Sequence, residues 1–133
     1  MNYVSDYYNN IEVPDGPFGL SHVYEKQIVD ILEKFDTNKA AGIDGLSGIF
    51  LKDGAKILSK SISDLINLSI SLSTVPDSCK VAKLKPLFKK GSKFEPKNFR
   101  PISLLTLISK VLEKVIHDQT QTFLTDNSIL YCY

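Results

Sequence analysis

Apolar residues recur at three- to four-residue spacing, the period of an amphipathic helix, in three stretches of this 133-residue chain. The spacing predicts one helix over about 22–35, capped by Ser21, and a longer helix over about 54–72. A third apolar stripe starts at Leu104 and predicts a helix that continues to about Thr125. A short helix over 46–52 fits between the first two. Most of the chain is therefore expected to be helical.

Past the second helix the period shortens to two, which is typical of a β-strand. Two sets of residues alternate over 81–88: the first is Val81, Lys83, Lys85 and Leu87, and the second is Ala82, Leu84, Pro86 and Phe88. Residues 99–105 form another extended stretch. Pro86 and Pro101 confine these stretches to the edges or bulges of a sheet. The polar loop 89–98 joins them, so we expect a short antiparallel β-hairpin. Together with the helices, this hairpin predicts a predominantly helical α+β fold.

Composition excludes several classes of protein. A chain that is 43% hydrophobic with a net charge of +1 is not disordered, and its only cysteines, Cys79 and Cys132, do not make a disulfide scaffold. No apolar run approaches the ~18 residues of a membrane span, and the first six residues show no signal peptide. We therefore expect an intracellular protein, nuclear or cytoplasmic, without a membrane partner. Its first twenty residues form an irregular lead-in, and a single domain follows over 21–133.

The small net charge hides a strong segregation of charge along the chain. Residues 1–36 hold two lysines against seven acidic residues, a net charge of −5. Residues 80–100 hold eight basic residues against Glu95 alone, a net charge of +7. A basic segment of this kind is typical of a surface that faces a polyanion, although a solvated loop balanced by the acidic N-terminal part has the same composition.

Residues that could carry catalysis or hold a metal are few. His22 and His117 stand among ordinary helical residues, and neither has the spacing of a zinc ligand. The chain has no phosphate-binding glycine-rich loop and no acidic pair in an apolar strand, and Asp44 taken alone is typical of a turn. The residues by themselves therefore give little indication of catalysis or metal binding.

The basic hairpin offers a different chemistry. Lys89 and Lys90 precede its loop and Arg100 follows it, so the two arms can bring these cations to one side. Ammonium groups act as point charges on a triphosphate, and a planar guanidinium can grip phosphate or stack on a base. An exposed hairpin without a ligand would also carry lysines.

Four blocks of residues then follow one another in a recognisable order. Asn-Lys-Ala-Ala-Gly-Ile-Asp-Gly spans 38–45, with Leu-Lys at 51–52, and Val-Pro-Asp-Ser-Cys-Lys-Val-Ala spans 75–82. Lys-Pro-Leu-Phe-Lys-Lys-Gly spans 85–91, and Asn-Phe-Arg-Pro-Ile-Ser-Leu-Leu spans 98–105.

The last block continues as Ser-Lys-Val-Leu-Glu-Lys-Val-Ile over 109–116. Over about 25–131, this succession resembles the reverse transcriptases of non-LTR (LINE-type) retrotransposons. Cys79 stands where that family commonly has tryptophan.

The resemblance implies the N-terminal part of the fingers of a right-hand RNA-directed DNA polymerase. In that family two Mg²⁺ ions are held by aspartates of the palm, in a Phe-x-Asp block and a Tyr/Phe-x-Asp-Asp block. Both blocks lie beyond the point where this sequence ends, in the middle of an element at 129–133. The resemblance therefore implies a chain that binds no Mg²⁺ itself and is inactive alone, with Mg²⁺ a cofactor of the full-length enzyme only.

The resemblance also assigns binding residues. Lys89, Lys90 and Arg100 match positions that contact the incoming nucleotide, a dNTP. A second set matches a region near the RNA template and DNA primer, and its members are Lys39, Gly42, Asp44, Gly45 and Lys110. Lys114 lies on the same helix as Lys110 and is as readily explained as part of a solvated face.

Three hypotheses remain open from the sequence. The chain is the fingers portion of a polymerase that works only when joined to a palm, a nucleic-acid-binding remnant without chemistry, or a decayed transposon fragment without selected activity. If the chain is a nucleic-acid-binding remnant, its affinity for a single strand should fall as the salt concentration rises. If it is a decayed fragment, it should expose apolar surface and be unstable.

Overall fold

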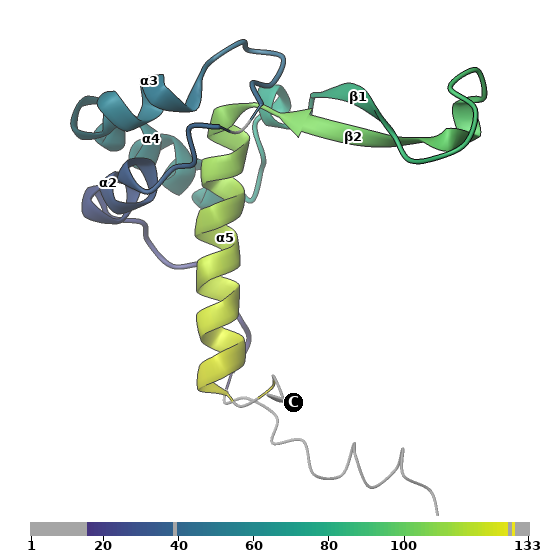
Figure 1. Cartoon of the computed structure of the whole chain (residues 1–133). Coiled ribbons are helices and arrows are strands. Elements are labelled where there is room, and N and C mark those ends of the chain that lie inside the picture. Colours follow the sequence, from purple (N-terminus) through teal and green to yellow (C-terminus); the bar gives the residue numbers. More distant parts are fainter. Residues whose placement is uncertain (1–15, 39, 128, 130–133) are drawn as a thin grey trace, which may run out of the picture.

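Four α-helices and two β-strands make up the part of the chain that the computed structural model describes, residues 16–38, 40–127 and 129. The helices are α2 (Glu25–Glu33), α3 (Gly48–Asp53), α4 (Ala55–Ser71) and α5 (Leu107–Asp126). The strands are β1 (Ala82–Phe88) and β2 (Phe99–Leu105), and single 3-10 turns are formed by Asp77–Cys79 and Pro96–Asn98. The fold is therefore α+β, with a helical body and a hairpin that extends from it (Figure 1).

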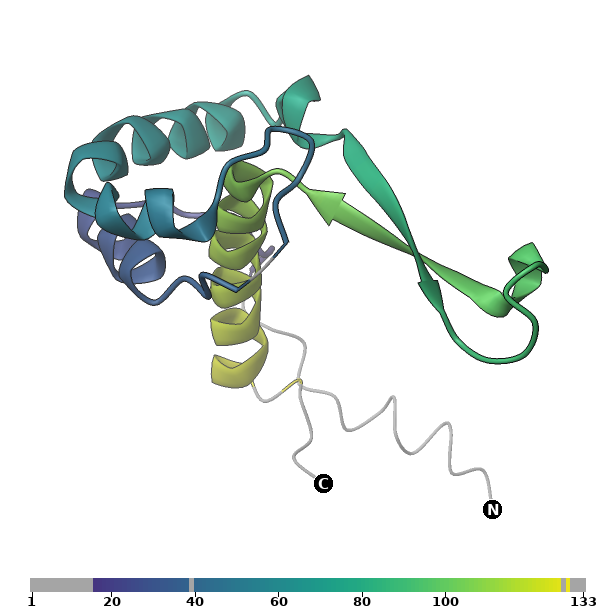
Figure 2. The same cartoon turned by 45° about the horizontal axis from the view of Figure 1, so that its top comes forward.

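The helical body is built around α5, with α2, α3 and α4 gathered beside its N-terminal half (Figure 2). Its core is one cluster of aliphatic side chains, each no more than 6% exposed. The cluster consists of Val23, Ile28, Leu32, Leu51, Ala55, Ile62, Ile66, Leu107, Val111, Leu112 and Val115. Part of each predicted helical stripe lies in this cluster, but Ile57 and Leu65 of the second stripe are exposed, so the buried face of that helix is narrower than predicted.

The first helix begins later than predicted. It starts at Glu25, with Tyr24 as N-cap, so the expected start at His22 and the cap at Ser21 are wrong. The backbone before Glu25 stays extended because the side-chain amide of Asn67 binds both the N–H and the C=O of Val23, each at 2.8 Å. Ser21 makes an equivalent pair of backbone hydrogen bonds with the side chain of Gln119.

The other helices lie close to their predicted positions. α3 is capped by Ser47, whose hydroxyl accepts a hydrogen bond from the N–H of Phe50, and α4 ends at Ser71, one residue before the expected Leu72. α5 begins at Leu107 and not at Leu104, because Leu104 belongs to β2. None of the helices in the described ranges is long and apolar enough to cross a bilayer.

The predicted hairpin is confirmed. β1 pairs with β2 in antiparallel register, and Pro86 lies opposite Pro101. A sheet of two strands has only edges, which is where proline is tolerated. The hairpin points away from the helices, and its loop lies far from them (Figures 1 and 2). Residues 1–15 of the predicted lead-in and residues 130–133 at the chain end lie outside the described part.

Candidate nucleic-acid interface

The three residues predicted to contact a nucleotide lie together at the outer end of the hairpin. Arg100 pairs with Leu87, and the N–H of Lys89 continues the ladder by donating to the carbonyl of Asn98 at 2.8 Å. Because side chains alternate along a strand, Lys89 shares a face with Leu87 and Arg100. Lys90 follows at the start of the loop.

That face of the hairpin is basic along its whole length. The register places Lys83 opposite Leu104 and Lys85 opposite Ile102, on the same face as Arg100. All three cations are exposed, and within the described part of the chain neither they nor Lys89 and Lys90 form a side-chain hydrogen bond or ion pair. These charges are therefore available to an anion.

The hairpin loop is held in shape by Asn98. Its side-chain amide donates to the carbonyl of Ser92 at 2.8 Å, and its backbone N–H donates to the carbonyl of Glu95 at 3.0 Å. Gly91 has a φ of +93°, and a Cβ there would lie 2.8 Å from the Asn98 amide nitrogen. The loop accordingly requires glycine at this position.

The residues predicted to lie near template and primer are at the other end of the hairpin. Gly42 is buried against the junction of β2 and α5, where an added Cβ would contact the carbonyl oxygen of Leu105 and lie 2.9 Å from Cα of Thr106. Gly45 closes the turn with a φ of +67°, and its N–H donates to the Gly42 carbonyl at 3.3 Å. These two glycines bring the 40–46 loop against the base of the hairpin.

Asp44 fastens this loop to α5. One carboxylate oxygen accepts the N–H of Leu107, the first residue of α5, at 3.2 Å, and the other accepts the N–H of Leu46 at 3.4 Å. An acidic side chain at a helix N-terminus satisfies a free N–H and interacts favourably with the helix dipole. The structure thus gives Asp44 a helix-capping contact in addition to the turn that the sequence predicted.

Lys110 of α5 contacts the same loop, because its ammonium group donates a hydrogen bond to the carbonyl of Ala40 at 3.0 Å. Lys114, one turn further along α5, pairs with Asp118 at 2.7 Å. Lys39 lies outside the described residues. The structure therefore brings Gly42, Asp44, Gly45 and Lys110 together at the hairpin base and separates them from the cations at its outer end.

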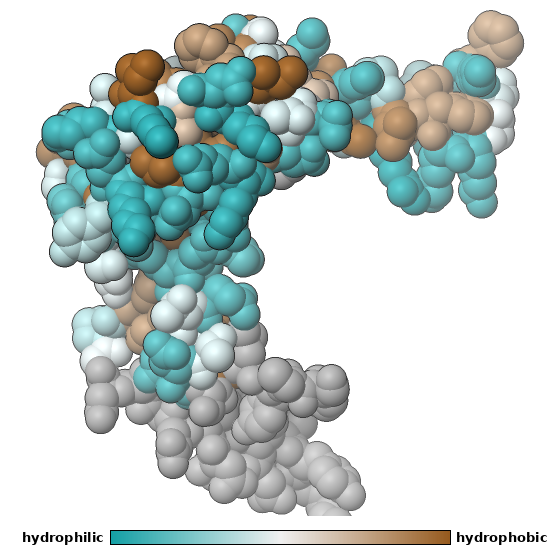
Figure 3. All heavy atoms as spheres, turned by 60° about the vertical axis from the view of Figure 1, so that its left-hand side comes forward, coloured by the Kyte–Doolittle hydropathy of each residue, from teal (hydrophilic) through white to brown (hydrophobic). Residues whose placement is uncertain are grey.

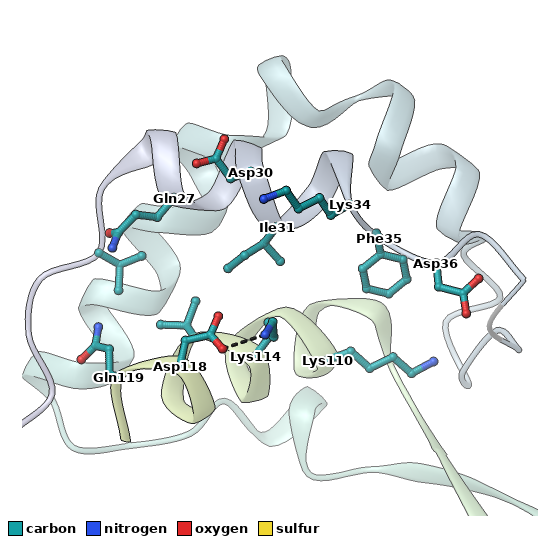
Figure 4. Close-up of a pocket in the computed structure, with 12 residues that line it drawn as sticks. Gln27, Asp30, Ile31, Lys34, Phe35, Asp36, Lys110, Lys114, Asp118 and Gln119 are labelled. Atoms are coloured by element: carbon teal, nitrogen blue, oxygen red, sulfur yellow. Dashed lines mark hydrogen bonds and ion pairs between the residues drawn. The ribbon is translucent and has the colours of Figure 1, made fainter. Parts of the chain in front are cut away.

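A cleft of about 460 Å³ separates α2 from α5 (Figure 4). Its floor is apolar, and its rim carries charges of both signs, from Asp30, Lys34, Asp36, Lys110, Lys114 and Asp118. Partial burial alone would raise the pKa of Asp118, but the hydrogen bonds and charges of Lys114 and His117 outweigh burial and hold that pKa below its usual range. Balanced charge gives this cleft no clear preference for an anion.

The second face of the hairpin contains a feature that the sequence analysis did not identify. Leu84, Pro86, Phe99 and Pro101 lie on the face opposite the lysines, and with Phe94 of the loop they line a groove. The alternation of lysine with apolar residues along β1 could have predicted this apolar face, but we interpreted it only as the period of a strand.

The chain is similar to a known polymerase. No protein-family profile matches it. A probable RNA-directed DNA polymerase from transposon BS of Drosophila melanogaster is 27% identical to it over 106 residues. This chain resembles a transposon reverse transcriptase. The match covers 79% of this chain but 12% of the relative, so the chain spans only a small part of that polymerase.

Proposed function

We propose that this chain is part of the fingers of an RNA-directed DNA polymerase from a non-LTR retrotransposon, and that its hairpin binds the incoming nucleotide. The observation that carries the proposal is the exposed basic face of the hairpin, where Lys89 and Arg100 lie on the same face and form no ion pair in the described structure. The similarity to a transposon polymerase over 79% of the chain supports it independently.

The chemistry of the hairpin end suits a nucleoside triphosphate. Lys89 and Lys90 supply mobile ammonium charges, and Arg100 supplies a planar donor set that can bind two phosphate oxygens or stack on a base. The ladder between the strands fixes the backbone that carries Lys89 and Arg100. The hairpin therefore positions charge against the phosphates, a role in binding and orientation.

We further propose that the loop at the hairpin base lies beside the template and primer. Lys110 supplies positive charge there, Gly42, Asp44 and Gly45 give the loop its shape, and Lys39 belongs to this set by sequence alone. In this arrangement the loop also fixes the direction in which the hairpin leaves the body.

The described residues do not fit the two Mg²⁺ ions that DNA polymerases use. No three His, Cys, Asp or Glu side chains among them are placed to hold a metal ion. Both oxygens of Asp44 accept backbone N–H groups, and Glu95 near the hairpin end pairs with Lys97 at 3.1 Å. Metal chemistry would have to come from other parts of a polymerase, and we propose that this chain alone is inactive.

Arg100→Ala tests the nucleotide role. We expect the variant to bind a fluorescent deoxynucleoside triphosphate about tenfold more weakly, because a charge-assisted hydrogen bond is lost. The control is Lys56→Ala, which removes an exposed cation from α4 and should leave affinity unchanged. In a polymerase that contains this chain with its palm, Arg100→Ala should abolish primer extension. Extension at the wild-type rate would show that Arg100 does not have this role.

Nucleic-acid binding without chemistry is the second candidate function, and the +7 charge of residues 80–100 favours it. Affinity for a single strand should then fall linearly with the logarithm of salt concentration, by about 0.7 per neutralised phosphate. A flat salt response would exclude this function.

A further inference from the structure

The apolar groove on the second face of the hairpin has a volume of about 420 Å³. That volume is within the roughly 300 to 1,000 Å³ of small-ligand sites. Three prolines, two phenylalanines, a leucine and Lys93 line it, and no described helix covers it (Figures 1 and 3). Figure 3 shows hydrophobic side chains along the outer part of the hairpin with hydrophilic side chains beside them.

Phe88 supports two of the side chains that line the groove. Phe99 lies opposite Phe88 in the strand register, and their rings meet edge to face with centroids 5.5 Å apart. The ammonium group of Lys93 stands 5.6 Å from the centre of the Phe88 ring, within range of a cation–π contact. Through Phe88, these contacts position Phe99 and Lys93, which line the groove, and side chains that are already positioned lower the ordering cost of binding.

Phe94 is the most unusual residue of the groove. Its side chain is 97% exposed, at the edge of a hairpin loop, where a large apolar ring is unfavourable in water. The loop backbone around it is ordered, since the N–H of Phe94 donates to the Ser92 hydroxyl at 3.3 Å. An exposed ring on an ordered backbone is a surface on which a flat ligand can stack.

The charges around the groove indicate what that ligand is. Lys93 directly precedes Phe94 in the chain, lines the groove with it and forms no ion pair within the described ranges. Glu95 is the acidic residue nearest in sequence, and its charge is balanced by Lys97. Aromatic rings with cations beside them bind single-stranded nucleic acid, through base stacking and phosphate attraction together.

We propose that this groove binds unpaired bases of single-stranded nucleic acid, with one base stacked on Phe94 and an adjoining phosphate beside Lys93. The inference rests on the nucleic-acid role proposed above, but it concerns the face of the hairpin opposite Lys89 and Arg100. The two faces would then divide the work, one contacting phosphates of the nucleotide and the other holding a strand.

The experiment uses Phe94→Ala in the whole chain. The probe is fluorescein-labelled oligothymidylate of about 12 nucleotides, within the usual range of single-strand sites, and binding is followed by anisotropy. Loss of one stacked base should weaken binding about tenfold. Because Phe94 carries no charge, the slope of log affinity against log salt should not change, whereas Lys93→Gln should reduce it by about 0.7.

Two controls separate stacking from other effects. Ile57→Ala removes a side chain that is 82% exposed on α4, and it should leave affinity unchanged. An abasic oligomer of the same length keeps the phosphates and lacks the bases, so Phe94→Ala should hardly alter its affinity. The chain has no tryptophan, so Phe94→Trp introduces a single reporter whose fluorescence a stacked base should quench.

Several outcomes would overturn the proposal. Equal affinity of Phe94→Ala and wild type for oligothymidylate would do so, as would an equal loss for the abasic oligomer. Quenching of Phe94→Trp by a proline-rich peptide but not by oligothymidylate would assign the groove to a protein partner. Self-association that Phe94→Ala abolishes would assign it to a second copy of the chain. If Arg100→Ala still weakens triphosphate binding in any of these cases, only the groove proposal fails.

Discussion

The helical body of this protein contains a buried apolar core, whereas neither strand of the hairpin contains a buried residue. In the body the core side chains are at most 6% exposed, whereas on the hairpin Leu84 is 66% exposed and Phe94 97%. The body is stabilised by burial, but the hairpin has no layer to pack against, and an isolated two-stranded hairpin is marginally stable in water. Apolar residues that do not stabilise the fold are therefore candidates for binding something else.

The same comparison shows which contacts fix the direction of the hairpin relative to the helical body. Its contacts with the body are concentrated at its base, where Gly42 and Asp44 meet the junction of β2 and α5. On the other strand, the hydroxyl of Ser109 donates to the carbonyl of Cys79, shortly before β1, at 3.1 Å. The position of the basic outer end is therefore decided by a few contacts far from it.

The largest expected effect contrasts two leucines. Leu32→Ala opens a cavity in the core and should lower the free energy of unfolding by about 3 kcal/mol, while Leu84→Ala on the hairpin should change it by less than about 0.5 kcal/mol. Urea denaturation followed by circular dichroism measures both. Equal losses would mean that the hairpin is packed as tightly as the body in solution.

Gly42→Ala should have the next largest effect, a loss of about 2 kcal/mol, because its Cβ would overlap the backbone at Leu105 and Thr106. Gly19→Ala is the matched control, since nothing lies within 4 Å of a Cβ at Gly19. The same denaturation measurement compares the two variants. A Gly42 variant as stable as the Gly19 variant would show that the loop does not press on the hairpin base.

Asp44→Ala should cost about 1 kcal/mol, the usual value of a lost helix cap, and should speed hydrogen exchange at the N-terminus of α5. Asp44→Asn keeps an acceptor oxygen and should recover most of that loss. Hydrogen exchange at the N-terminus of α5, measured by mass spectrometry, distinguishes the alanine variant from the asparagine variant. If the asparagine variant were as impaired as the alanine variant, the carboxylate charge would be the essential property.

The smallest effect concerns the pH dependence contributed by Asp118. Because its pKa is lowered in the folded state, its ion pair stabilises the fold above the unfolded pKa, and that contribution is lost as pH falls through the folded value. The pair is about half exposed, so solvent screening limits the contribution at neutral pH to about 0.5 kcal/mol. Asp118→Asn should therefore differ from wild type at pH 7 and converge with it in acid. If the free energies of unfolding of Asp118→Asn and wild type differed by the same amount from pH 7 down into acid, the effect of the substitution would be one of packing.

Much of the fold could be predicted from local patterns. The helical stripes and the period-two stretch depend on neighbours in sequence, so the elements fell within a few residues of their predicted bounds. The start of α2 was missed because its extended approach depends on Asn67, 44 residues away from Val23. Likewise, the contact of Asp44 with Leu107 joins residues 63 apart, and nothing in the local pattern reveals it.

The sequence by itself determined the elements, the concentration of basic charge at 80–100 and the similarity to transposon polymerases, because these depend on residue order alone. Only the tertiary structure decided that the predicted binding residues divide between the two ends of the hairpin. It also decided that the apolar face of the hairpin stays uncovered, since burial depends on which surfaces meet after the chain has folded. That uncovered face is where Phe94 stands beside Lys93.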